Sequence, residues 1–306
     1  MSEAASAARG PRVFLDYDQA ALDAAYNQRL YAPNAEQLLA RFASASAAMR
    51  ARLGEPLRRA YGPSETERLD IYQSRSGTAP APIAVFIHGG AWRNGAARNY
   101  AFPAEMFTAA GAHYVALDFI LVEAAGGSLM PMIEQVRRAI AWVGENAASF
   151  GGDPRRLYLI GHSSGAHLSG AALLTDWTAF GLPDDLIRGA LLVSGMYDLK
   201  PVRLSARSSY VKFDDAMEAA LSTQRHIDRI RTPVTIAHGT HESPEFIRQS
   251  RDFAAALAAA GKPVELVLGE NCNHFEMMDG LGNPYAVGGR AALAMMGLAL
   301  MGARRP

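Results

Sequence analysis

A serine between two glycines stands where an apolar run gives way to a helical one. Residues 157–160 predict a buried strand, and Gly-His-Ser-Ser-Gly follows at 161–165 before a helical stretch. A strand, a sharp turn and a helix together make a nucleophile elbow. The glycines have no Cβ, so the backbone can fold back tightly and leave Ser163 strained, with its hydroxyl above the sheet. We therefore predict that Ser163 is a nucleophile.

A serine hydroxyl needs a base to accept its proton, and in the order serine, acid, histidine that base comes late in the chain. His274 follows the last predicted strand and precedes the final helical region, so we predict it as the base. We interpret His113, at the start of a strand, and His226, in a polar helical run, as structural or solvated. His238 and His241 have the spacing of a metal pair, but no third ligand lies nearby, so we predict no metal.

Two carboxylates compete to orient that imidazole. Glu242 lies in the loop after the strand predicted at 234–237, and Asp198 follows the strand predicted at 190–193, one strand earlier. The acid is expected from the loop after the strand before the histidine, which favours Glu242. Glu242 could instead be a surface charge at the start of the next helix. We therefore predict Glu242 as the acid and keep Asp198 as the alternative.

A glycine loop could supply the remaining chemistry. A predicted strand ends in His-Gly-Gly-Ala-Trp at 88–92. Nucleophilic attack on a carbonyl creates an oxyanion, which needs hydrogen-bond donors that are already in position. The backbone N–H groups of Gly89, Gly90 and Ala91 can be aimed there without obstruction, and Ser164, next to the nucleophile, adds another. These four residues are the predicted oxyanion hole.

The elements that must position these residues follow an alternating pattern. From residue 68 onward, apolar β-rich runs alternate with amphipathic helical stretches, which indicates a mostly parallel sheet with helices on both faces. Sites in such sheets form at the carboxyl ends of the strands. Two helices between residues 18 and 53, broken near Pro33, precede the sheet. The predicted strands are 69–72, 83–87, 114–117, 157–160, 190–193, 234–237 and 264–268, and the helices between them include 132–147, 166–174 and 246–260.

Length and charge limit the organisation and the partners. The 306 residues fit one large core, so we predict a single domain over 1–306, with a helical N-terminal arm at 1–60 and a helical insertion near the site at 201–231. Lys plus Arg and Asp plus Glu are 30 each. With no net charge there is no field to gather phosphates or an anionic bilayer, so we expect no nucleic-acid partner and no membrane partner.

The cysteine content and the apolar segments bear on the compartment. The single cysteine, Cys272, cannot form an internal disulfide and fits a reducing environment, so we expect a cytoplasmic location. Residues 1–9 do not read as a secretory signal. The longest apolar stretch, 291–303, falls short of the roughly 20 residues of a membrane span and is interpreted as a terminal helix.

Taken together, these segments resemble the kynurenine formamidase (arylformamidase) group of α/β hydrolases. The segments at 88–92 and 161–168 are similar to the family's His-Gly-Gly-x-Trp signature and nucleophile segment. Residues 241–250 resemble its acid loop and following helix, and 273–275 its histidine loop. Further likeness lies at 26–29 (Tyr-Asn-Gln-Arg) and 195–201, so the resemblance covers most of the chain.

The resemblance implies an α/β-hydrolase fold, with Ser163 as nucleophile, Glu242 as acid and His274 as base. The sequence departs from the family's usual pattern in three places. Glu242 stands where aspartate is common, Ala91 where an aromatic residue is usual, and the stretch at 118–123 replaces an Asp-Tyr-Arg-Leu-Ala-Pro-like segment. These departures bear on the substrate more than on the mechanism.

The implied reaction is hydrolysis of an N-acyl aromatic amine, with N-formylkynurenine as the first substrate to test and no cofactor required. The alternative is a carboxylesterase or an aryl-acylamidase that acts on N-acylanthranilate-like amides. Among the aromatic residues near the site, Trp92 and Phe275 are predicted to contact this small-molecule substrate. The N-terminal arm either roofs the pocket or forms a homodimer contact. A non-enzymatic scaffold would be expected to have lost a triad member, and none is missing.

Overall fold

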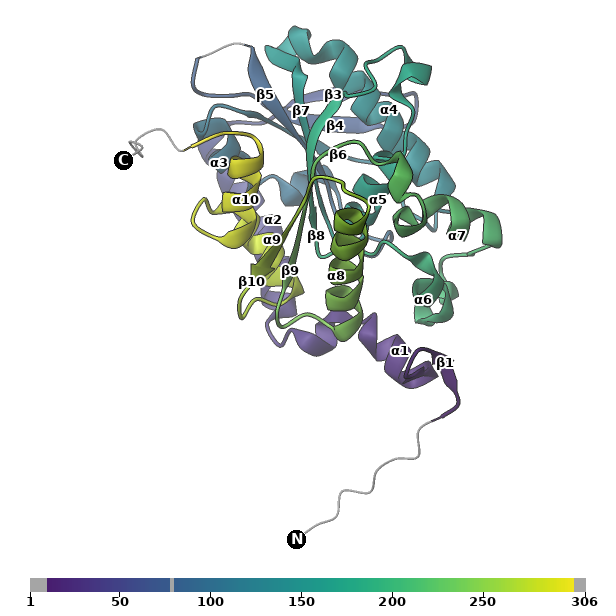
Figure 1. Ribbon diagram of the computed structural model, residues 1–306. Coiled ribbons are helices and arrows are strands. Elements are labelled where there is room, and N and C mark those ends of the chain that lie inside the picture. Colours follow the sequence, from purple (N-terminus) through teal and green to yellow (C-terminus); the bar gives the residue numbers. More distant parts are fainter. Residues whose placement is uncertain (1–9, 78–79, 300–306) are drawn as a thin grey trace.

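The computed structural model describes residues 10–77 and 80–299. Within these residues eight strands form one sheet in the order β10-β9-β8-β7-β5-β6-β4-β3 (Figure 1). Strands β5 to β10 are parallel, and β4 and β3 add an antiparallel edge. The strands are β3 Leu57–Ala60, β4 Arg68–Tyr72, β5 Ala81–Ile87, β6 His113–Leu117, β7 Gly152–His162, β8 Ile187–Val193, β9 Val234–Gly239 and β10 Val264–Gly269, and a separate hairpin pairs β1 Arg12–Phe14 with β2 Tyr17–Asp18.

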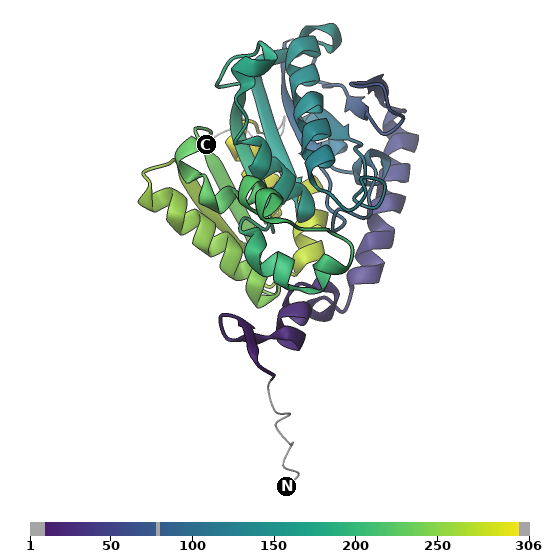
Figure 2. The same cartoon turned by 90° about the vertical axis from the view of Figure 1, so that its right-hand side faces the viewer.

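Helices cover both faces of the sheet (Figures 1 and 2). One face carries α4 Met130–Asn146, α5 Ser164–Ala172 and α8 Pro244–Ala259, with α6 Leu199–Leu204 and α7 Asp215–Leu221 beside them. The other carries α2 Ala35–Leu53, α3 Ala104–Ala109, α9 His274–Asp279 and α10 Val287–Met295. Helix α1, Gln19–Ala25, lies beyond the lower end of the sheet in Figure 1. Short 3₁₀ turns include η1 Gln28–Tyr31, η2 Ala97–Tyr100, η3 Ala147–Phe150, η4 Trp177–Phe180, η5 Ala206–Ser209, η6 Thr223–Arg225, η7 Ile227–Arg229 and η8 Gly280–Gly282.

The fold class predicted from the sequence is confirmed. All seven predicted strands are present, and each is extended by at least one residue. Three strands were not predicted, β1, β2 and β3. Strand β3 carries Arg58 and Arg59 and is mostly exposed, so it lacks the apolar pattern by which buried strands are found. The last four residues of the helical arm predicted at 1–60 therefore belong to the sheet.

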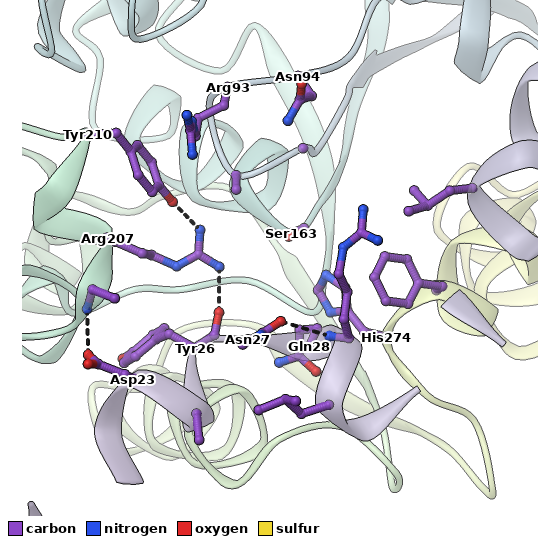
Figure 3. A pocket seen from close by; sticks show the side chains of 18 of the residues that line it. Asp23, Tyr26, Asn27, Gln28, Arg93, Asn94, Ser163, Arg207, Tyr210 and His274 are labelled. Carbon is purple, nitrogen blue, oxygen red and sulfur yellow. Dashed lines mark hydrogen bonds between the residues drawn. The ribbon is translucent and has the colours of Figure 1, made fainter. Parts of the chain in front are cut away.

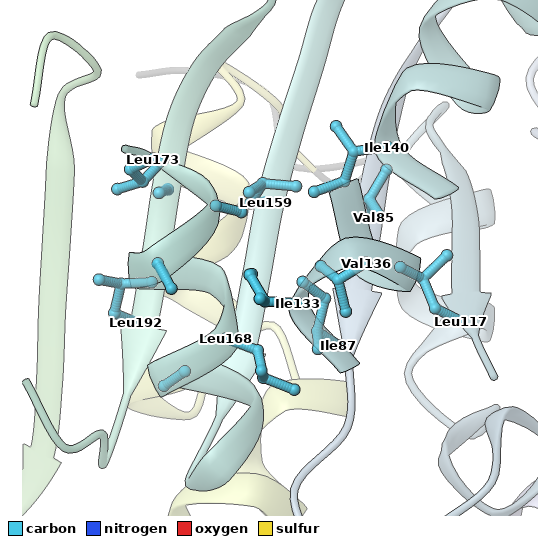
Figure 4. Packing of buried hydrophobic residues seen from close by; sticks show 14 of the residues in the cluster. Val85, Ile87, Leu117, Ile133, Val136, Ile140, Leu159, Leu168, Leu173 and Leu192 are labelled. Carbon is cyan, nitrogen blue, oxygen red and sulfur yellow. The ribbon is translucent and has the colours of Figure 1, made fainter. Parts of the chain in front are cut away.

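Apolar side chains fill the space between the sheet and the helices. Every residue of β5 is buried, and Val85 and Ile87 point from it toward α4 (Figure 4). On α4, Ile133, Val136 and Ile140 recur at the three- and four-residue spacing that places side chains on one helix face. This spacing explains why α4 is amphipathic and why it packs against β5 and β7.

The order of the strands creates the place for a site. Strand β5 pairs with β6 on one side and with β7 on the other, so the chain changes direction across the sheet at this point. In open α/β sheets, ligands bind outside the carboxyl ends of the strands at such a switch point. The carboxyl end of β5 leads into Gly89 and Gly90, and that of β7 leads into Ser163.

No helix in residues 10–77 and 80–299 is long and apolar enough to cross a membrane. Helix α10 covers part of the terminal helix predicted at 291–303, of which residues 300–303 lie outside the described part of the chain. Residues 1–9, where we predicted no secretory signal, also lie outside it.

The packing of the core predicts that truncation of leucine to alanine lowers the free energy of unfolding by different amounts at two strand positions. Leu159 on central β7 is fully buried, whereas Leu266 on edge strand β10 is 39% exposed. We expect Leu159→Ala to lower the free energy of unfolding by about 2–5 kcal/mol and Leu266→Ala by less than about 1 kcal/mol. Urea unfolding followed by circular dichroism measures both. Equal losses would contradict the assigned core.

Candidate active site

The turn between β7 and α5 holds Ser163 in a strained conformation. Ser163 has φ 58° and ψ −124°, and its N–H donates to Val193 O at 2.9 Å. Only glycine fits at the two flanking positions. A Cβ on Gly161 would overlap the carbonyl of Gly165, and a Cβ on Gly165 would overlap Ile87 O at the end of β5. The tight packing of these glycines sustains the strain and fixes the direction of Ser163.

The glycine loop after β5 lies against this turn. A Cβ on Gly89 would lie 2.8 Å from His162 O and 3.0 Å from Ser163 Cβ. Gly90 and Ala91 have φ values of 111° and 55°, and both line the cavity that Ser163 also lines. Within the described part of the chain, no protein acceptor engages the N–H groups of Gly90 and Ala91. They are therefore free to receive a negative oxygen.

Ser164 begins α5, so its N–H belongs to the first helical turn and has no carbonyl partner within the helix. A residue at this position can donate toward a group bound at Ser163. Its side chain has a different task, because Ser164 Oγ accepts from Trp92 N at 3.2 Å and so ties the glycine loop to the elbow.

Trp92 does not line the cavity, contrary to its predicted substrate contact. The ring is 1% exposed, and Nε1 donates to His167 Nδ1 at 3.3 Å. Burial lowers the pKa of His167 to about 4, so this imidazole is neutral and its Nδ1 can accept. Trp92 instead supports the glycine loop through its bonds to Ser164 and His167. Phe275, the other predicted contact, lines the cavity.

The histidine ring beside the loop is also structural. His88 stacks between Tyr100, at 5.6 Å between ring centroids, and Phe119, at 4.4 Å. Its Nδ1 lies 2.8 Å from Gly89 O, and burial lowers the pKa of His88. The stack holds the start of the glycine loop in place.

The structure brings Glu242 and His274 into direct contact. Glu242 Oε2 lies 2.9 Å from His274 Nδ1, and the two side chains are 0% and 5% exposed. In a neutral imidazole one ring nitrogen donates and the other accepts, so a hydrogen on Nδ1, directed at the carboxylate, leaves the lone pair on Nε2. This is the tautomer that a base needs.

Two further groups hold the carboxylate of Glu242. Its Oε1 accepts from Ser194 Oγ and from Gly239 N, each at 2.6 Å. Ser194 was missed by sequence reasoning, although it directly precedes the shared turn at 195–201. The competing acid, Asp198, has other hydrogen-bond partners. Its Oδ1 accepts from Lys200 N, which caps α6, and pairs with Arg225 at 3.2 Å.

His162, inside the elbow, also contacts His274 and was not predicted. Its Nε2 lies 2.9 Å from His274 O, and the two ring centroids are 4.6 Å apart. Burial, together with the adjacent His274, holds the pKa of His162 well below its ordinary value. A neutral ring that donates to a carbonyl adds no charge, so His162 positions the backbone of His274.

Ser163 and His274 line the same cavity, and Figure 3 shows Ser163 between Arg207 on one side and His274 on the other. No hydrogen bond joins their side chains within the described residues. Hydrogen bonds between a nucleophile and its base are often long before substrate is bound and tighten in the complex, so both residues remain candidates. The residues predicted as nucleophile, base and acid therefore meet as one connected pair and a neighbouring serine.

The cavity has a volume of about 910 Å³, which lies within the range of small-molecule sites. The N-terminal arm forms much of its wall. Asp23, Tyr26, Gln28, Leu39 and Phe42 of the arm all line it, as do Ala206, Arg207, Ser209 and Tyr210 of the insertion. Of the two roles left open for the arm, a contribution to the pocket wall is thus observed.

Hydrogen bonds fasten the arm to the loop that carries Glu242. Gln28 donates to Ser243 Oγ at 2.8 Å and accepts from Ser243 N at 3.2 Å. Tyr26 OH donates to Glu245 Oε2 at 3.0 Å and accepts from Gln249 Nε2 at 2.7 Å. These bonds give a structural reason for the motifs at 26–29 and 241–250.

The remaining histidines lie apart from the site. His113, at the start of β6, accepts from Ser74 N at 3.0 Å, and His226 is partly exposed. His238 is fully buried, whereas His241 is exposed. Within residues 10–77 and 80–299 no three His, Cys, Asp or Glu side chains are grouped closely enough to hold a metal ion.

Comparison with known proteins places the chain in a family. The family described as BD-FAE matches residues 69–180. A kynurenine formamidase from Danio rerio is 32% identical over 226 residues, which span 72% of this chain and 75% of the relative. The chain belongs to the kynurenine formamidase family. It is therefore an enzyme, a hydrolase of the class that cleaves amide or ester bonds. The kynurenine formamidase of Salmo salar matches at 31% identity, with the same coverage.

Esterases appear among the more distant relatives of this family member. An isoprenylcysteine α-carbonyl methylesterase of Arabidopsis thaliana is 27% identical over 71% of this chain and 56% of its own length. Solved structures show the same fold at lower identity. A protein assigned as a thioesterase from Silicibacter sp. TM1040 superposes with a TM-score of 0.76, 23% identity and coverage of 90% of this chain and 98% of its own. An esterase from Thermogutta terrifontis superposes with a TM-score of 0.66 and 22% identity, and the match covers 82% of this chain and 98% of the esterase.

The arm contacts predict that Gln28→Ala loosens the N-terminal wall. The substitution removes both hydrogen bonds to Ser243 and leaves the buried Ser243 N–H without an acceptor, which costs about 1–3 kcal/mol, whereas Ser243 Oγ keeps its bond to Ala25 O. Amide hydrogen exchange should quicken in residues 19–31 and remain unchanged in β5 and β7. Gln37→Ala, an exposed glutamine on α2, is the control. Unchanged exchange in 19–31 would show that the arm is held by other contacts.

Proposed function

We propose that this family member is a serine hydrolase that cleaves the N-formyl group from an aromatic amine, with an N-formylkynurenine-type compound as substrate. The observation that carries the proposal is the buried Glu242–His274 pair, at 2.9 Å, which opens onto a cavity shared with the strained Ser163. The similarity to kynurenine formamidases supports the choice of amide.

The proposed reaction has two halves. Ser163 Oγ attacks the formyl carbon while His274 Nε2 takes the hydroxyl proton, and Glu242 stabilises the imidazolium that forms. The N–H groups of Gly90, Ala91 and Ser164 stabilise the oxyanion. His274 then donates its proton to the aryl nitrogen, the carbon–nitrogen bond breaks, and the free amine leaves a formyl ester on Ser163.

Water completes the cycle. His274 removes a proton from a water molecule, the resulting hydroxide adds to the formyl ester, and the ester bond breaks as the proton returns to Ser163. Formate leaves and the free enzyme is restored. Gly89, predicted with the oxyanion donors, has a steric role in this scheme, because its missing Cβ lets the glycine loop reach the elbow.

A specific observation favours a second candidate, a carboxylesterase or an aryl-acylamidase that accepts larger acyl groups. Ala91 lines the cavity with a methyl group where the family usually has an aromatic ring, which leaves more room beside the oxyanion loop. Relatives named as methylesterases show that related chains act on esters.

Comparing three substrates separates the two candidates. We expect kcat/KM to fall from N-formylkynurenine to N-acetylanthranilate and p-nitrophenyl acetate, and we expect Ser163→Ala to lower every rate by about ten-thousandfold or more. If the formamide is the poorest substrate, the formamidase assignment is wrong. If Ser163→Ala is fully active, the nucleophile is wrong.

Two carboxylate variants test the acid. In Glu242→Gln one oxygen is replaced by an NH₂ group, yet the site presents donors to both oxygens, so His274 is driven toward the other tautomer. We expect kcat to fall about 10³- to 10⁴-fold, as for the equivalent change in other triads. Asp198→Asn should alter kcat by less than about threefold. The reverse ranking would make Asp198 the acid.

A further inference from the structure

The pocket contains a cationic side chain without an acidic partner. Arg207, from η5 of the insertion, is 9% exposed and lines the cavity. Its terminal nitrogens donate to Tyr210 OH at 2.9 Å and to Tyr26 O at 3.0 Å, and its Nε has no partner. Within the described part of the chain, no carboxylate pairs with it. Buried charges in proteins are ordinarily paired, so Arg207 is an exception that needs a reason.

The other charged residues of the cavity are already paired. Arg29 forms an ion pair with Glu36 and Arg93 one with Glu123, and both arginine side chains are about half exposed. The acidic residue of the wall, Asp23, accepts from Ala206 N at 2.6 Å and from Gln19 Nε2 at 2.9 Å instead of pairing with Arg207. Arg207 therefore differs from its neighbours in both burial and pairing.

Aromatic rings hold the guanidinium close to the reaction centre. Its carbon lies 5.5 Å from the centroid of Trp92 and 5.9 Å from that of Tyr26. Trp92 is in turn bonded to Ser164, next to the nucleophile. Figure 3 shows the guanidinium directed into the pocket between Tyr210 and Tyr26, across from His274. Ring faces stabilise a cation but leave its remaining N–H donors unused.

We propose that Arg207 binds a carboxylate on the amine half of the substrate, so that the enzyme acts on N-acyl aromatic amines that bear a carboxylate. The inference rests on the proposed function and narrows its substrate class. A guanidinium matches a carboxylate in geometry and charge, and the bond is strong where water is excluded. A formyl group carries no further substituent, so the carboxylate must lie on the amine half of the substrate. Phe42, Tyr100 and Phe275 of the wall offer apolar surface to the aryl ring.

A matched pair of substrates tests this role. N-formylkynurenine and its carboxamide differ only in the carboxylate. We expect the wild-type enzyme to prefer the acid by about 10- to 100-fold in kcat/KM, mainly through KM. Arg207→Met should abolish the preference and leave the carboxamide within about threefold of wild type, and Arg207→Lys should retain part of it.

Arg203→Met is the control, because it removes the same charge from the same insertion. Arg203 lies outside the cavity and pairs with Asp215 and Glu218. It should leave the preference intact. Equal turnover of acid and carboxamide by the wild type, or equal losses for both in Arg207→Met, would overturn the proposal and make Arg207 a fastening of the arm. If neither amide is hydrolysed, the proposed function is wrong. Calorimetric measurement of the binding of both compounds to Ser163→Ala then still decides whether Arg207 binds the carboxylate.

Discussion

The buried contact between Glu242 and His274 is the interaction on which the rest of the site depends. A carboxylate taken out of water must be compensated, and here Ser194, Gly239 and His274 supply all of its donors. The loops are joined as well as the side chains, since Thr240 N and His241 N donate to backbone oxygens of the segment that leads to His274. The imidazole is thereby fixed before any substrate arrives.

Much of this arrangement could be predicted from the sequence because the relevant signals are local. Apolar runs separated by amphipathic stretches identified the central strands, and glycines at 161 and 165 identified the turn at Ser163. The structure explains why these signals are reliable: a side chain at Gly165 would overlap the end of β5. Edge strand β3 escaped because exposed arginines erase the apolar pattern.

What the sequence could not show are contacts between distant segments. Gln28 and Ser243 are 215 positions apart, and nothing in either segment indicates the pairing. Trp92 was assigned to the substrate on its residue type, whereas its burial depends on contacts with His167 of α5 and Arg207 of the insertion. No sequence motif surrounds Arg207, and its proposed role in binding follows from its burial in the cavity wall without a carboxylate partner.

Because the N-terminal arm contributes to the cavity wall, the residues proposed for bond cleavage and the residues that shape the cavity come largely from different parts of the chain. The groups proposed for bond cleavage follow strands of the sheet, while a large share of the cavity wall comes from residues before residue 54 and from the insertion. Exchange of arms between related proteins would therefore change the wall of the cavity, and the reactive groups would keep their positions where the contacts of Gln28 and Tyr26 with residues 243–249 are preserved. Such a division gives evolution, or an engineer, a route to new selectivity by transplanting one terminal segment.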